Sequence, residues 1–214
     1  MSGLADALLL VLDALAIALV GLGRLVPSIR IVALQAWSLA LLVLVVHGPD
    51  APVHAGVIAA ALIAVRGVAI PLILRRLARG QAAREPSPLL GYGASLLLAG
   101  IFMGIAMAVA AGLPAPGEVF SDLLFPSALG NVLLGFLLIA SRRKALTQVL
   151  GYLGMETGIF LAGLPLVDAM PLALELGVFL DVFLGVFVMG VMVHHMGRVL
   201  EHADTDDLNA LRES

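Results

Sequence analysis

Five ionisable side chains interrupt long apolar stretches of this sequence: Asp13, Arg66, Glu156, Glu175 and Asp181. An ionisable group in the hydrocarbon core of a bilayer costs roughly 2.5–3.5 kcal/mol, so such a residue is expected to face protein or water and to have a function. A carboxylate that is removed from water can exchange a proton near neutral pH. We therefore interpret the five residues as candidates for ion translocation, with a structural ion pair or a packing role as the alternative for each.

Glu156 lies near the middle of its apolar stretch, together with a stripe of small residues. Gly151, Gly154 and Gly158 can lie along one side of the same helix, and small residues at such spacing let a neighbouring backbone approach closely. At about 100° per residue, Glu156 points almost opposite to Gly154. We therefore predict that the glycines pack against one neighbour while the carboxylate faces another.

Arg66 is the only basic residue in the middle of an apolar stretch. Pro71, five residues later, removes the helical hydrogen bond to the carbonyl of Gly67 and predicts a kink. Arginine does not lose its proton in proteins. Arg66 is therefore expected to pair with a carboxylate, for which Asp181 is the candidate, and not to relay a proton itself.

The remaining acidic candidates differ in their surroundings. Asp181 has a glycine one turn away on either side, which indicates close packing, whereas Glu175 is nearer the outer end and could reach interfacial water. Asp13 is seven residues from Asp6 and on the same helix face, which suggests a polar stripe against a partner subunit. The neighbouring His194 and His195 point to different helix faces, so we do not expect a metal site there.

The composition predicts an all-α integral membrane protein. Hydrophobic residues make up 61% of the 214 residues and charged residues 13%, and the mean hydropathy is +1.10. A soluble domain is nearer 45–50% apolar. A helix needs roughly 20 apolar residues to cross a bilayer. Seven stretches meet this length: residues 4–22, 29–46, 53–74, 88–112, 124–140, 146–167 and 172–196.

The basic residues predict the orientation, because positive charges concentrate on the cytoplasmic side. The first, third and fifth loops and the tail contain eleven of the twelve basic residues, and the twelfth is Arg66. The second, fourth and sixth loops contain only acidic charges. The basic set is Arg24, Arg30, Arg75, Arg76, Arg79, Arg84, Arg142, Arg143, Lys144, Arg198 and Arg212. We therefore expect the N-terminus outside and the C-terminus in the cytoplasm.

Three segments carry a resemblance to a known family. Residues 142–158, which read RRKALTQVLGYLGMETG, resemble the hydrogenase-4 component E pattern of a basic loop followed by Q-x-x-G-Y-x-x-M-E-x-G. Residues 175–183 are similar to its E-x-G-x-x-x-D segment, and the tail at 206–211 is similar to its ending. The last three predicted helices also resemble subunit K of NADH:quinone oxidoreductase and the C subunit of multi-subunit sodium/proton antiporters.

The resemblance implies a role for each of these residues. It places Glu156 in the buried polar axis of a proton-translocating membrane arm, with Asp181 and Glu175 as further members. At position 66 the family would have a lysine, and an arginine keeps the charge but not the ability to lose it. The resemblance also implies a non-catalytic subunit with no cofactor, since electron transfer belongs to peripheral hydrogenase-like subunits. Antiporter-like and subunit-H-like membrane subunits would be its neighbours.

The expected organisation is a four-helix segment at 1–112, a subunit-K-like segment at 113–197 and a cytoplasmic tail at 198–214. We expect the protein in a bacterial or archaeal cell membrane, as a complex-I-like subunit that takes part in proton or sodium translocation. It contains no cysteine, which excludes disulfides and iron–sulfur clusters, and no nucleic-acid-binding surface is expected. An autonomous transporter of a small solute and a structural subunit without an ion path remain as alternatives.

Overall fold

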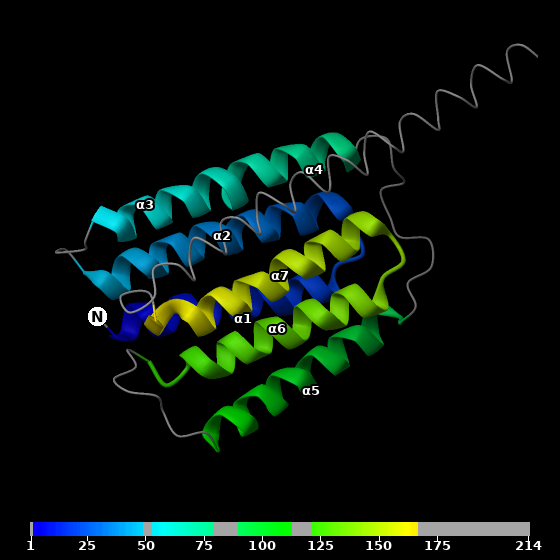
Figure 1. Cartoon of the computed structure of the whole chain (residues 1–214). Helices are drawn as coiled ribbons and strands as arrows, with labels where there is room; N and C mark the ends of the chain where they lie inside the picture. The colour runs from blue at the N-terminus through cyan, green and yellow to red at the C-terminus, as the bar shows by residue number, and fades with distance from the viewer. Residues whose placement is uncertain (1, 49–52, 79–89, 113–120, 167–214) are drawn as a thin grey trace, which may run out of the picture. The chain divides into compact units, whose positions relative to one another are not determined.

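The computed structural model describes residues 2–48, 53–78, 90–112 and 121–166. All of them belong to one compact unit, Met1–Val178, and a second unit, Phe179–Ser214, lies outside the described residues. Within the described ranges the backbone is helical apart from short connections, as Figure 1 shows. The predicted all-α fold is therefore confirmed for this part of the chain.

The helices follow one another with short turns or longer connections. In chain order they are α1 (Ser2–Gly21), α2 (Leu25–His47), α3 (Val53–Leu62), the π-helix η1 (Ile63–Ala69), α4 (Ile70–Ala78), α5 (Tyr92–Ala111), α6 (Leu124–Ser141), α7 (Ala145–Gly163) and the 3-10 turn η2 (Leu164–Leu166). The segments α3, η1 and α4 follow one another without a break and form one continuous span. Six of the seven predicted stretches are thus helical, and the seventh, residues 172–196, lies outside the described residues.

Some helix boundaries differ from the prediction. Helix α2 begins at Leu25, four residues before the predicted start, although Pro27 lies in its first turn. Proline is tolerated there because the first N–H groups of a helix have no intrahelical partner. The hydroxyl of Ser28 donates to the carbonyl oxygen of Arg24 at 2.8 Å and supports the same turn. Helix α5 begins at Tyr92, four residues after the predicted start.

Five of the described helices are long and apolar enough to cross a membrane. They comprise residues Gly3–Gly21, Leu25–His47, Ala55–Ala78, Tyr92–Ala111 and Leu124–Ser141. Helix α7 is not among them, because Gln148, Glu156 and Thr157 make it more polar. It lies inside the bundle, where much of its surface is covered by other helices. The chain is therefore a membrane-embedded helical protein, with α7 as an interior helix.

The helices pack side by side as a bundle around α1, α6 and α7. Helix α1 contacts α2, α5 and α6, and α7 contacts α6 and α2. The continuous span α3–η1–α4 packs along α2, and α5 packs on the other side, against α6 and α1 (Figure 1). Helices from the predicted segments 1–112 and 113–197 therefore pack against each other within one unit.

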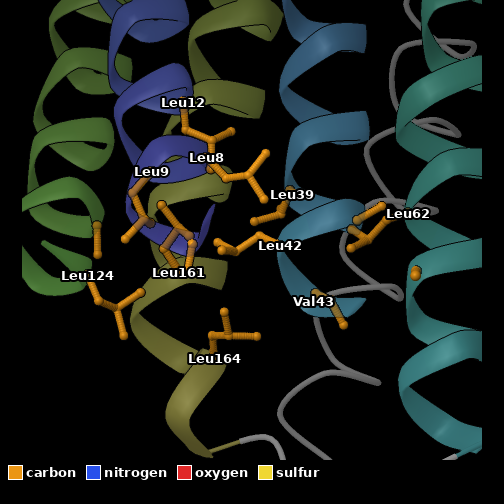
Figure 2. Packing of buried hydrophobic residues seen from close by; sticks show 14 of the residues in the cluster. Leu8, Leu9, Leu12, Leu39, Leu42, Val43, Leu62, Leu124, Leu161 and Leu164 are labelled. Carbon is orange, nitrogen blue, oxygen red and sulfur yellow. The ribbon is translucent and has the colours of Figure 1, made fainter. Parts of the chain in front are cut away.

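Leucine side chains form the apolar core at one end of this bundle. Leu9 and Leu12 of α1 meet Leu39 and Leu42 of α2 and Leu161 of α7, as Figure 2 shows. These five side chains are fully buried. The leucines of these three helices therefore form an apolar core toward the end of the bundle where α1 begins and α7 ends.

Candidate functional site

Arg66 and Glu156 form a buried ion pair between η1 and α7. Nη2 of Arg66 lies 3.7 Å from Oε2 of Glu156, and the two side chains are 2% and 7% exposed. Opposite charges at this separation attract by about 4 kcal/mol at an effective dielectric constant near 20. The two charges are therefore placed to stabilise each other.

The guanidinium of Arg66 is also anchored to α7 itself. Its Nη2 donates to the carbonyl oxygen of Leu153 at 2.6 Å and to Oγ1 of Thr157 at 3.2 Å. Thr157 Oγ1 in turn donates to the same Leu153 carbonyl oxygen at 3.0 Å. Because these contacts do not involve the carboxylate, they can hold Arg66 in place whether Glu156 is charged or neutral.

Arg66 projects from the π-helix η1, in which the N–H of Ile70 donates to the carbonyl of Val65, five residues earlier. Such π segments are frequent at functional sites. The π-helix ends at Ala69, two residues before Pro71, and the kink expected at this proline stays a prediction. Gly67 leaves room for α2, since a Cβ there would lie 2.9 Å from Nε1 of Trp37.

The glycines of α7 pack against α6. A Cβ at Gly158 would lie 2.5 Å from the carbonyl oxygen of Ala128, and one at Gly151 would lie 2.9 Å from that of Gly135. A Cβ at Gly135 would in turn collide with the α7 backbone. The predicted two-sided packing of this helix is therefore confirmed: the small residues face α6, and Glu156 faces η1.

Asp13 contacts α6 of its own chain. Oγ of Ser127 donates to its Oδ2 at 2.8 Å, and Nδ2 of Asn131 donates to its Oδ1 at 2.9 Å. Asp6 accepts a hydrogen bond from the hydroxyl of Ser121, in the connection before α6. Both carboxylates thus accept hydrogen bonds from their own chain and remain partly exposed, and the interpretation of Asp6 and Asp13 as a polar stripe against a partner subunit stays a prediction.

The predicted site residues have different outcomes. Arg66 has a carboxylate neighbour within the bundle, as predicted, and the structure shows Glu156 in that position. The proposed partner Asp181 lies outside the described residues, as do Glu175, His194 and His195. The structure therefore brings together Arg66 and Glu156 and places Asp13 in a separate cluster on α1 and α6.

Sequence reasoning missed the polar side chains that accompany the charged ones. Ser127 and Asn131 are four residues apart in an otherwise apolar helix, and this spacing puts them on one helix face. Both are almost fully buried, as are Thr157 and Gln35. The i, i+4 pair of polar residues in α6 was the signal that would have indicated a partner for Asp13.

Arg142 is the second buried arginine, although we had counted it with the basic loop residues. Its Nη2 donates to the carbonyl oxygen of Val20 at 2.7 Å, at the C-terminal end of α1. Its guanidinium carbon lies 4.6 Å from the centre of the Tyr92 ring, and its own carbonyl accepts from Nε2 of Gln148 at 3.0 Å. A cation is favoured at a helix C-terminus, so Arg142 joins α1, α5 and α7 at this end of the bundle.

The described residues contain no group of three or more His, Cys, Asp or Glu side chains that could hold a metal ion. What the bundle provides instead is the half-buried carboxylate of Asp13 and the buried carboxylate of Glu156, in different surroundings. Asp13 is held by neutral donors, and Glu156 lies beside a cation. Carboxylates in such surroundings can bind or release a proton.

The amino-acid sequence of this chain is similar to those of several known proteins. An uncharacterized protein of Mycobacterium tuberculosis is 32% identical over 157 residues, which are 72% of this chain and 70% of that protein. Hydrogenase-4 component E of Escherichia coli is 31% identical over 144 residues, 67% of each chain, and the Shigella flexneri protein of the same name matches equally. No family model and no solved structure matches the chain.

Proposed function

The chain belongs to the family of hydrogenase-4 component E, and from this we propose that it is a membrane-arm subunit of a complex-I-like oxidoreductase that translocates protons or sodium ions. In this proposal the chain has no redox centre of its own and contributes buried charges to the ion path. The relatives named hydrogenase-4 component E support membership in a hydrogenase-type assembly. The apolar helices support a place in its membrane part.

The observation that carries the proposal is the Arg66–Glu156 pair. A charged pair buried between two helices of an apolar bundle has a large desolvation cost, and packing alone does not require it. Glu156 also lies within the segment that resembles the family pattern, in an interior helix. We therefore assign to Glu156 the ion-handling role in this subunit.

The geometry suggests how the two residues share this role. Arg66 keeps its charge and is fixed on α7 by Leu153 and Thr157. Only Glu156 can change its charge, so the site alternates between a neutral ion pair and a single positive charge. An ion that passes nearby meets a different field in each state, which is what a relay between neighbouring subunits needs.

Neighbouring subunits complete the proposed path. Antiporter-like and subunit-H-like membrane subunits would lie beside this chain, and peripheral hydrogenase-like subunits would supply the electrons. Glu175 and Asp181 would extend the polar axis from Glu156. The cell membrane of a bacterium or an archaeon is the expected location.

Glu156→Gln tests the proposal. Glutamine keeps the size and most hydrogen bonds of the side chain but cannot ionise. We expect the complex to assemble at near-normal levels while ion pumping per transferred electron falls sharply. Glu156→Asp should retain part of the activity, because the titratable group survives with a shorter reach.

The assay measures pumping in reconstituted vesicles, with the assembled amount quantified alongside. Asp122→Asn is the matched control, because Asp122 is an exposed acid in the connection before α6. It should pump normally. Normal pumping by fully assembled Glu156→Gln would contradict the proposal and favour a structural role.

A further inference from the structure

Gln35 is a buried polar side chain in the middle of α2, and it is 1% exposed. Neither Nε2 nor Oε1 of its amide has a hydrogen-bond partner among the residues that the structure describes. A half-turn of the amide exchanges these two atoms and leaves both of them without a partner. An amide buried in this state has a large desolvation cost, so Gln35 requires a polar ligand.

The direction of the Gln35 side chain follows from two leucines farther along α2. Leu39 and Leu42 belong to the apolar core, where they meet Leu161 of α7 (Figure 2). At about 100° per residue, Gln35 lies between these two leucines in direction around the helix axis. Its side chain therefore points into the same seam between α2 and α7, one helical turn nearer the start of α2.

Thr157 has the corresponding position on α7. It precedes Leu161 by four residues, as Gln35 precedes Leu39, and it is buried as well. Helices α2 and α7 contact each other and run in the same direction (Figure 1). Both polar residues therefore lie one turn before the leucine core, at the same level of the seam.

The ion pair lies at this level too. The guanidinium of Arg66 reaches α7 from η1 and lies 3.7 Å from Oε2 of Glu156. A Cβ at Gly67, the next residue of η1, would lie 2.9 Å from Nε1 of Trp37. Trp37 follows Gln35 by two residues, which is about 3 Å along the axis of α2. Because α2 contacts both η1 and α7, its buried amide borders the space in which the pair is held.

From this arrangement we propose that Gln35 is a positioning residue that binds one water molecule beside the Glu156 carboxylate, and that Glu156 exchanges its proton with this water. Water is the ligand that suits a neutral amide, because it accepts from Nε2 or donates to Oε1. Buried waters typically make about three hydrogen bonds to polar groups that otherwise lack a partner. An ion would instead bring a charge that the amide does not balance.

The proton transfer needs only these two groups. When protonated Glu156 gives up its proton, the O–H bonding pair stays on the carboxylate, and a lone pair of the water oxygen binds the proton to form hydronium. Uptake is the reverse. Arg66 cannot take this part because it does not lose its proton, and the neutral amide of Gln35 holds the water without competing for the proton. That the exchange belongs to ion translocation rests on the proposed function, whereas the water site does not.

The first measurement detects the water on the purified full-length chain in detergent. The sequence contains three glutamines, Gln35, Gln81 and Gln148, so labelling glutamine side chains with ¹⁵N gives three NH₂ signals in an NMR spectrum. Gln35→Met removes one of them and thereby assigns it. We expect a dipolar cross-peak between water and the Gln35 NH₂ group. Its absence would overturn the proposal.

The second measurement is pumping per transferred electron in reconstituted vesicles, with the assembled amount quantified alongside. Gln35→Met keeps the length of the side chain but has no amide to hold the water, so we expect pumping to be lost at near-normal assembly. Gln35→Asn keeps the amide with a shorter reach and should retain part of the activity. A packing role alone predicts the opposite order, because methionine fills the volume and removes a costly unpaired amide.

The outcomes separate this proposal from the proposed function. Normal pumping by fully assembled Gln35→Met, beside defective Glu156→Gln, would overturn the water site and leave the role of Glu156 standing. Normal pumping by Glu156→Gln would contradict the proposed function itself. Gln35→Asn keeps the test decisive if Gln35→Met does not assemble, since undiminished pumping by Gln35→Asn would also count against a water held at this position.

Discussion

Replacing Arg66 by methionine should destabilise the bundle more than the same change at an exposed arginine. Methionine has a similar length but no charge, so Arg66→Met removes the ion pair with Glu156 and both hydrogen bonds to α7. Removing one partner of a buried pair costs about 3–5 kcal/mol, because the other charge remains without compensation. Glu156→Leu should lower the free energy of unfolding by a comparable amount, because it leaves the Arg66 guanidinium beside an apolar side chain.

The double variant Arg66→Met with Glu156→Leu measures the coupling energy between the two residues, apart from what each contributes by itself. An apolar pair in place of a buried ion pair is often neutral or stabilising. Thr157 continues to donate to the Leu153 carbonyl oxygen when Arg66 is absent, so no backbone acceptor on α7 is stranded. The double variant should therefore be more stable than either single variant, with a coupling energy of about 3 kcal/mol or more.

The measurement is reversible unfolding of the purified chain in mixed micelles as the denaturing detergent is increased. Arg75→Met is the matched control, because Arg75 is exposed on α4, and it should change the free energy of unfolding by no more than about 0.5 kcal/mol. Arg66→Lys should largely preserve stability, since it keeps the charge. Additivity of the two single variants within about 0.5 kcal/mol would refute the ion pair.

Two further predictions concern packing and orientation. Gly158→Ala should lower the free energy of unfolding by about 1–3 kcal/mol, because the new Cβ would meet the α6 backbone and overpacking forces the helices apart. Gly163→Ala is the control, because Gly163 has open space around it, and it should leave the free energy of unfolding unchanged in the same assay. Cysteines introduced at Ala115 and Ala82, both outside the described residues, should be labelled from opposite sides of the membrane, Ala115 from outside, and labelling from one side only would contradict the predicted orientation.

Sequence patterns predicted the helices well because each helix is a long apolar run bounded by polar or turn-forming residues. The short connection at Gly23 and Arg24 and the basic turn at Arg143 are visible as breaks in hydropathy. The start of α2 was misplaced because Pro27 looks like a helix breaker, whereas the first turn accepts it. Membrane-spanning composition was a poorer guide for α7, because Glu156 and Thr157 are polar residues buried against other helices.

Residue spacing also predicted which face of a helix a side chain occupies, but not which helix that face meets. Glu156 was correctly placed opposite the glycine stripe from the turn angle alone. Its contact with Arg66 depends on how α7 lies against η1, and no local pattern encodes the arrangement of helices that are distant in sequence. Arg142 was read as a loop charge for the same reason, because its acceptor at Val20 belongs to α1.

The partners of Asp13 and of Arg66 lie next to one contact between α6 and α7. Gly158 packs against the α6 backbone at Ala128 and Val132, each of which directly follows a residue that binds Asp13, and it is itself next to Thr157, which binds Arg66. Because the two backbones are closely packed at this glycine, a movement of α6 is expected to be transmitted to α7. The hydrogen bonds that hold Asp13 and the contacts that hold Arg66 are therefore each one residue away from the same α6–α7 contact.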